Sequence, residues 1–250
     1  GRHVAYGPFS IAAAIAGDGP RAQLVFASPL PAAGLRDVHV LLAPIADGFR
    51  FDTHGDSHLG LFDGQIDLYS APAGRSRLEV RRLAVSDMQV AGGLVLGDTG
   101  ANGTLAVSGG GMNGRLTLAP RSGGQGVGIE LAGKDARFRG ATPLSIRKLQ
   151  FSGSAVLGSE RAEAQGSLFA QGLSRGRLFI GRLAARADVA DGKGSVTASM
   201  AGRRGSRFNL QLEAGFAPQR IAVALRGDFA DKRISMPRRA ILTGEAGGWR

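Results

Sequence analysis

The sequence predicts an all-β protein: an elongated, curved antiparallel sheet folded into an open groove. Three observations support this fold class. The 250 residues include 40 glycines with no Gly-X-Y period, which excludes collagen. The hydrophobic content of 43% is too high for a disordered segment. Large apolar residues alternate with small or polar ones in many short runs, which is typical of strands that bury one face.

The alternating runs predict strands along the whole chain. Residues 10–16 are rich in Ala, but Ile11 and Ile15 fit a strand of small residues, and residues 159–164 are interpreted in the same way. The clearest runs lie at residues 49–51, 59–61, 66–68, 78–80, 105–107, 116–118, 127–131, 144–146, 196–200, 208–212 and 221–225. Turn-forming residues separate them at 98–103, 109–111, 122–124 and 191–194. A spacing of roughly 10–14 residues per strand favours antiparallel hairpins, because parallel crossovers need longer connections.

Two pairs of similar internal segments, called echoes below, predict one continuous, repeat-built segment over residues 1–250. Residues 6–15 resemble 59–68, and residues 41–50 resemble 241–250, at offsets that share no common period. The second echo stops within a repeat, and the chain begins Gly1-Arg2-His3 without a signal peptide. We therefore expect an internal fragment, truncated at both ends, of a long open sheet rather than of a closed barrel.

Cysteine content, hydropathy and charge narrow the function classes. The absence of cysteine excludes disulfides and Cys-ligated metal centres and fits either a periplasmic or a cytosolic protein. No window approaches the ~18 apolar residues of a membrane-spanning helix. The net charge of +11 arises entirely in residues 126–250, which carry 21 Lys and Arg against ten acids. A basic surface can attract nucleic acid, anionic lipid or an acidic partner. Without a dense basic run or interleaved aromatic residues, we expect solvated strand faces and no nucleic-acid partner.

Two motif matches are coincidences of a Gly-rich sequence, and we predict no enzyme and no cofactor. Residues 172–176 match G-x-S-x-G, but a nucleophile elbow needs a strand–turn–helix and a His after the Ser. All four histidines precede Ser174. Residues 128–134 match G-x-x-x-x-G-K, but Asp135 replaces the Ser or Thr that would bind magnesium, and the run alternates like a strand.

A polar cluster and three arginine pairs have alternative interpretations. Asp52, His54, Asp56 and His58 would share a strand face and could hold zinc, whereas Gly55 and Ser57 favour a turn at this point. The Arg pairs at 81–82, 203–204 and 238–239 are expected near turns or strand ends, where charge discourages edge-to-edge aggregation. The alternative is that they contact lipid headgroups or a partner.

The apolar stripes would form either a dry core or the lining of a ligand groove. We expect a groove, because no predicted helical layer could cover the sheet and a large exposed apolar surface usually marks a binding site.

The run from Gly114-Arg115-Leu116-Thr117-Leu118 to Phe151, together with the Leu59-Gly60-Leu61-Phe62 echo, resembles the TamB branch of the AsmA-like family, in its alphaproteobacterial form. The resemblance implies a β-taco, a folded-over sheet whose apolar groove crosses the periplasm. It also implies phospholipid movement between the inner and outer membranes, and assembly of autotransporters with the outer-membrane barrel TamA. The family's inner-membrane helix and barrel-contacting domain would lie outside this fragment.

On this basis we expect phospholipid acyl chains to lie against eleven apolar side chains, with headgroups at the open seam. The expected lining residues are Val107, Leu116, Leu118, Val127, Ile129, Leu131, Phe208, Leu210, Leu212, Val223 and Leu225. One alternative is a chaperone-like scaffold that pairs with unfolded barrel strands through β-augmentation. Another is a structural or adhesive extracellular β-solenoid, which would stack parallel coils around a filled interior.

Overall fold

The computed structural model describes residues 8–17, 19–29, 34–70, 75–122, 124–140, 143–158, 163–191, 193–245 and 248–249. Several sequence features lie wholly or partly outside the described residues. These are residues 1–3, residues 6–7 of the first echo, residues 246–247 and 250 of the second echo, residues 159–162, and the turn glycines at 123 and 192.

The described residues form strands and turns, as the alternation predicts. The first nine strands are β1 (Phe9–Ala16), β2 (Gly19–Phe26), β3 (Arg36–Ile45), β4 (Gly48–Ser57), β5 (Gly60–Ser70), β6 (Ser76–Val85), β7 (Met88–Gly97), β8 (Gly100–Gly109) and β9 (Met112–Arg121). The remaining strands are β10 (Gly124–Phe138), β11 (Leu144–Leu157), β12 (Glu163–Arg175), β13 (Leu178–Ala190), β14 (Lys193–Arg204), β15 (Ser206–Ala217), β16 (Arg220–Phe229), β17 (Lys232–Ser235), β18 (Ala240–Glu245) and β19 (Gly248–Trp249).

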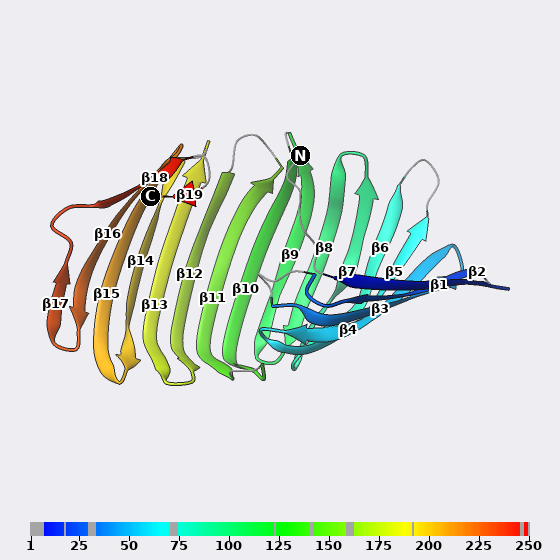
Figure 1. Cartoon of the computed structure of the whole chain (residues 1–250), viewed down its shortest axis with the longest axis horizontal. Helices are drawn as coiled ribbons and strands as arrows, with labels where there is room; N and C mark the ends of the chain where they lie inside the picture. Colours follow the sequence, from blue (N-terminus) through cyan, green and yellow to red (C-terminus); the bar gives the residue numbers. More distant parts are fainter. Residues whose placement is uncertain are drawn as a thin grey trace.

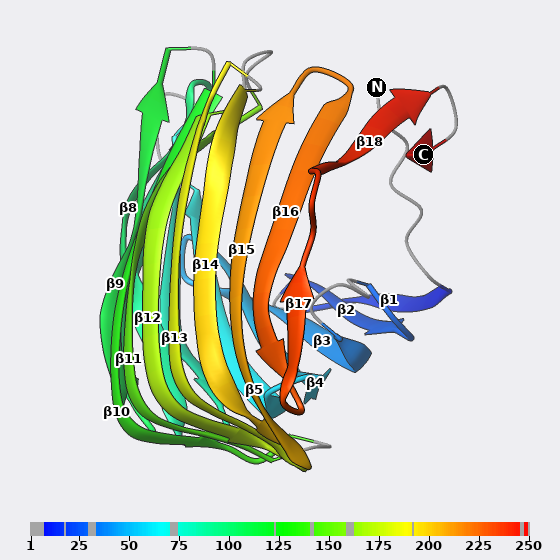
Figure 2. The same ribbon diagram turned by 90° about the vertical axis from the view of Figure 1, so that its left-hand side faces the viewer.

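Strands β1 to β18 build a single long antiparallel meander sheet that does not close into a barrel. From β1 to β16 each strand pairs with the next along the chain, β17 and β18 both pair with β16, and β19 pairs with β18. The long strands stand side by side, and β1 to β4 run across them on one side of the sheet (Figures 1 and 2). The all-β antiparallel prediction is confirmed. Parallel coils of a β-solenoid are not found among the described residues, because every register is antiparallel.

A line of irregular residues bends the long strands near one end, as Figure 2 shows for β10 to β14. In β10 and β11 the register passes from Lys134–Lys148 to Ala136–Ile146, so that Asp135 and Arg147 fall outside the regular pairs. The line continues through Gly172 in β12 and Gly181 in β13. Asp135 and Gly172 have positive φ values of 51° and 63°, a conformation that Gly and Asp adopt more readily than most residues. Such bulges let a sheet bend sharply.

The main buried cluster lies on the inside of this bend. Ala136, Ile146 and Ala170 are 0%, 7% and 1% exposed and pack with Met112 and Phe138. The residues beside them that point the other way, such as Lys134 and Lys148, are exposed. The apolar side of the sheet is therefore the concave side. We call it the inner face and the opposite side the outer face.

Two turn predictions are wrong in detail. Strand β4 continues through Gly55 to Ser57, since the absence of a side chain at Gly55 leaves room for the ring of Phe62 on the paired strand. The predicted turn at 98–103 is also shorter, because β8 already begins at Gly100 and pairs with β7. In both places glycine allows the paired strands to pack closely, and turn propensity does not predict this role.

Candidate functional site: an open apolar sheet face

The strand register places the predicted lining residues on one face. Directly opposed residues of an antiparallel pair point to the same side of a sheet. Leu118 opposes Val127 and Leu116 opposes Ile129 across β9 and β10. Gly114 opposes both Leu131 and Val107, which adds these two residues to the same side.

The second group of lining residues belongs to this same inner face. In β15, Phe208, Leu210 and Leu212 alternate along the strand, and Leu212 opposes Leu225 of β16, two residues from Val223. A row of opposed residues joins the two groups across six strands: Leu131, Phe151, Leu168, Ala185, Ala198 and Leu212. All eleven predicted residues therefore share the inner face.

The inner face is apolar and only partly shielded. Ten of the eleven residues are half-buried, and Phe208 is 9% exposed. The alternate residues Arg115, Thr117 and Glu130 point outward and are exposed. Every buried hydrophobic residue of the described part of the chain also lies on the inner face, where the described residues provide no helical layer to cover it. The surface is a wide concave sheet face rather than a closed cavity.

The lining predicted from sequence is incomplete. The same rows continue through β4 to β8, where Phe51, Ile66, Val80 and Leu94 face inward. Alternation marks the first three of these, so the sequence signal was present. In β11 to β14 small residues interrupt the large ones on the inner face, as where Gly153 opposes Gly166 beside Phe151 and Leu168, and this weakens the alternation.

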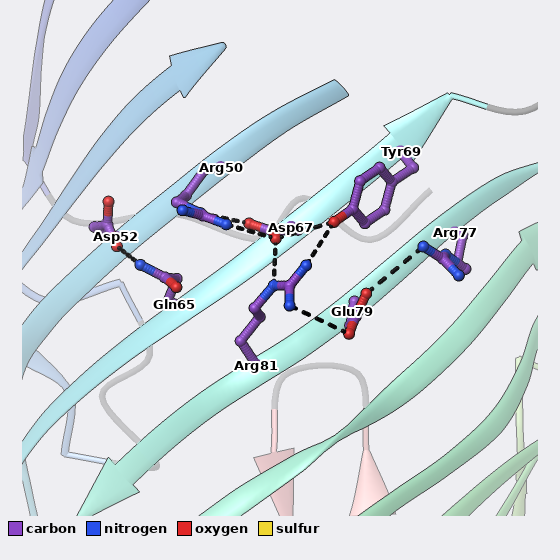
Figure 3. A network of polar contacts seen from close by, with 8 residues as sticks. All are labelled: Arg50, Asp52, Gln65, Asp67, Tyr69, Arg77, Glu79 and Arg81. Carbon is purple, nitrogen blue, oxygen red and sulfur yellow. Dashed lines mark hydrogen bonds and ion pairs between the residues drawn. The ribbon is translucent and has the colours of Figure 1, made fainter. Parts of the chain in front are cut away.

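The outer face of β4 to β6 carries a polar network centred on Asp67 (Figure 3). The Asp67 carboxylate is fully buried and accepts hydrogen bonds from Arg50 Nε at 2.7 Å, Arg81 Nε at 2.6 Å and the Tyr69 hydroxyl at 3.1 Å. Arg81 also donates to the Tyr69 hydroxyl at 2.8 Å. Because Arg81 belongs to a bulge between Val80 and Leu83, its side chain reaches back over β5.

This network fixes the charges of its members. The hydrogen bond from Arg50 holds the pKa of Asp67 well below its usual range, against the opposing effect of burial, and Arg81 and Tyr69 act in the same direction. The hydrogen bonds to Asp67 correspondingly raise the pKa values of Arg50 and Arg81. All hydrogen-bonding groups of Asp67 are turned toward partners in the chain, so we interpret the network as a clamp that joins three strands.

The Arg81–Arg82 pair was expected near a turn or strand end, and this expectation is wrong. The pair lies at the bulge within β6, where Arg81 binds Asp67 and Arg82 pairs with Asp63. The pair at 203–204 ends β14, and the pair at 238–239 lies between β17 and β18, as expected.

The residues of the possible zinc cluster have other neighbours. Asp52 accepts a hydrogen bond from Gln65, and Asp56 pairs with Arg36 at 2.7 Å. His54 stacks on His39 with ring centroids 4.7 Å apart. Among the described residues, no group of three or more His, Asp or Glu side chains is arranged to hold a metal ion.

Five hollows among the described residues lie on the outer face. One trough of about 600 Å³ crosses β9 to β13, where small residues such as Gly128, Ser154 and Ser167 lie between Arg115 and Arg186. The two catalytic-looking motifs lie elsewhere, and both are in strands: residues 128–134 within β10 and residues 172–175 at the end of β12. Neither has the loop-to-helix context that its chemistry needs.

No protein-family model, curated protein or solved structure matches this chain. Within the described ranges there is no helix long and apolar enough to cross a membrane. The fold and the inner face define the chain as an all-β protein with one long, open antiparallel sheet that has an apolar face.

Proposed function

We propose that this chain is a segment of a periplasm-spanning protein of the TamB and AsmA-like kind. Its inner face would carry phospholipid acyl chains between the inner and outer membranes, and the whole protein would support outer-membrane protein assembly with a TamA-like barrel. The observation that carries the proposal is the concave apolar face, which no helix of the described residues covers.

The apolar inner face would let bound acyl chains slide along it. Acyl chains gain about 25 cal/mol for each Å² of apolar surface that leaves water, and this attraction has no preferred direction along the groove. The side chains of the central inner rows are aliphatic or aromatic, whereas the buried carboxylate of Asp67 lies on the outer face. A polar headgroup would find no fixed partner among the inner rows, which favours binding by the tails.

A photo-crosslinking pair tests the proposal on adjacent residues. A photoreactive phenylalanine analogue at Leu118 should crosslink to phospholipid, since Leu118 faces inward. The same analogue at Thr117, the preceding residue of β9, should not, since Thr117 faces outward. Mass spectrometry of the gently purified protein should also find co-purifying phospholipid. Equal crosslinking at both positions, or a lipid-free inner face, would contradict the proposal.

A chaperone role is a second candidate, and the edge strand β1 favours it. All eight residues Phe9–Ala16 are exposed, and the strand contains no charged residue or proline. Unprotected edges of this kind are suited to pairing with another strand. Crosslinks to an unfolded barrel protein from Ala12 of β1, but not from Ala106 of the central strand β8, would support this role over lipid carriage.

A further inference from the structure

The outer side of the bend carries a concentrated positive charge. Seven exposed basic side chains occupy two rows and the bulge between them: Lys134, Arg137, Arg147, Lys148, Arg182, Arg203 and Arg207. Lys134 opposes Lys148, and Arg182 lies two strands further along the same row. Arg137 begins the second row, which ends at Arg203 and Arg207 on β14 and β15. We call these seven residues the basic strip.

The basic strip differs from the outer face of β3 to β6 in having no paired carboxylates. On β3 to β6 the arginines bind acids, as Arg36 binds Asp56 and Arg82 binds Asp63. None of the seven strip residues forms an ion pair with another described residue. Three acids lie near the strip: Asp135 in the bulge, Asp228 at the β16 end of the first row, and Asp231 beside Arg203 and Arg207. Uncompensated like charges at this density raise the energy of the folded protein, and a partner of opposite charge would relieve it.

Two phenylalanines lie beneath the strip. Lys148 and Arg182 both lie over the ring of Phe169, at 6.0 and 5.9 Å from its centroid, and Arg203 lies over Phe179 at 5.4 Å. These cation–π contacts position the charges and cover the ring faces. A hollow of about 550 Å³ opens beside Phe179, where Arg203 and Arg207 line it and Asp228 and Asp231 also contribute to the lining.

We propose that the basic strip docks the protein on a bilayer surface rich in anionic phospholipid. Neighbouring strands lie about 4.8 Å apart, so Lys148 of β11 and Arg182 of β13 present charges about 10 Å apart on the outer side of the bend. Such a surface suits many dispersed phosphates in a plane. Single-stranded nucleic acid would require free aromatic faces for base stacking, and the faces of Phe169 and Phe179 are occupied by cations. The proposal concerns headgroups on the outer face and is independent of lipid carriage by the inner face.

Vesicle flotation with charge-reversed variants tests the docking surface. The strip variant combines Arg147→Glu, Lys148→Glu and Arg182→Glu. The control variant combines Arg121→Glu, Lys193→Glu and Arg220→Glu, which are exposed residues at the opposite ends of the strands and give the same net charge. The probes are vesicles of phosphatidylcholine with one third phosphatidylglycerol, vesicles of phosphatidylcholine alone, and a labelled single-stranded DNA.

We expect the unaltered protein to bind the anionic vesicles and the strip variant to bind them at least about a hundredfold more weakly, since each basic residue near an anionic surface contributes several-fold to binding. The control variant should retain most of the binding, and added salt should weaken it. Thermal unfolding followed by circular dichroism would show that both variants fold. Equal loss in the two variants, equal binding to neutral vesicles, absence of vesicle binding, or tighter binding to the DNA would each overturn the proposal.

Discussion

Single side chains on the outer face stabilise the sheet by joining neighbouring strands. Asp67 is the clearest case, because a fully buried carboxylate is tolerated only where donors surround it. Its donors come from β4, β5 and β6, so one residue ties three strands together. No sequence pattern predicts this network. Arg50, Asp67 and Arg81 are far apart in the chain, and only the bulge in β6 brings Arg81 over the carboxylate.

Replacing Asp67 with Asn should lower the free energy of unfolding by about 2 kcal/mol, because two guanidinium groups lose their buried partner. This corresponds to a fall in Tm of about 6 °C for a chain of this size. The exposed Asp188, changed to Asn on the same outer face, is the matched control and should leave the Tm nearly unchanged. Similar losses in the two variants would show that the network does not stabilise the fold.

The unaltered protein and the Asp67→Asn variant should differ in how their Tm depends on pH. Because folding lowers the pKa of Asp67, the stabilisation by its ionised form is complete above the unfolded-state pKa of about 4 and is lost as the pH falls toward the folded-state value. The Tm difference between the unaltered protein and Asp67→Asn should therefore shrink between about pH 5 and about pH 2. A difference that stays constant over this range would mean that the ionised carboxylate is not the stabilising group.

At the scale of strands, the sequence predicts the regular parts and not the irregular ones. Period-two alternation identified the strands and the side of the sheet on which Leu116, Ile129 and Leu212 lie, because strand geometry alone fixes that relation. It did not predict the bend. The bend depends on Asp135, Arg147, Gly172 and Gly181 aligning across four strands, and this alignment follows from register rather than from local sequence.

Gly172 should be the residue of the bend least tolerant of a side chain. Its φ of +63° disfavours other residues, and a Cβ there would lie 2.9 Å from the Cβ of Arg147. We expect Gly172→Ala to cost about 1–2 kcal/mol in urea unfolding. Gly181→Ala, in the next strand of the same bend, should have little effect, because a Cβ there would lie 3.6 Å from its nearest neighbours. An effect of Gly181→Ala as large as that of Gly172→Ala would contradict this account of the bend.

At the scale of the whole molecule, the two faces of the sheet differ in charge and in burial. The outer face compensates charge with charge on β3 to β6 and leaves it uncompensated at the bend. The inner face gathers the buried hydrophobic residues but leaves the rows above the bend half-buried. A single sheet cannot cover its own apolar face, so the part of that face not closed by the bend must meet water or a ligand. The alternation in the sequence predicts an apolar face that is only partly covered. The curvature that makes this face concave is seen only in the structure.

A ligand of the inner face should therefore stabilise the whole sheet. A short-chain phosphatidylcholine, kept below its micelle concentration but at about 100 times its dissociation constant, would add about 2.7 kcal/mol by mass action and raise the Tm by roughly 5–10 °C. Glycerophosphocholine, which has the same headgroup without acyl chains, should leave the Tm unchanged. Leu118→Asn should reduce the lipid-induced shift, and Thr117→Asn on the outer face should not. A shift with glycerophosphocholine, or an equal shift in both variants, would place the binding site on headgroup contacts instead of on the apolar inner face.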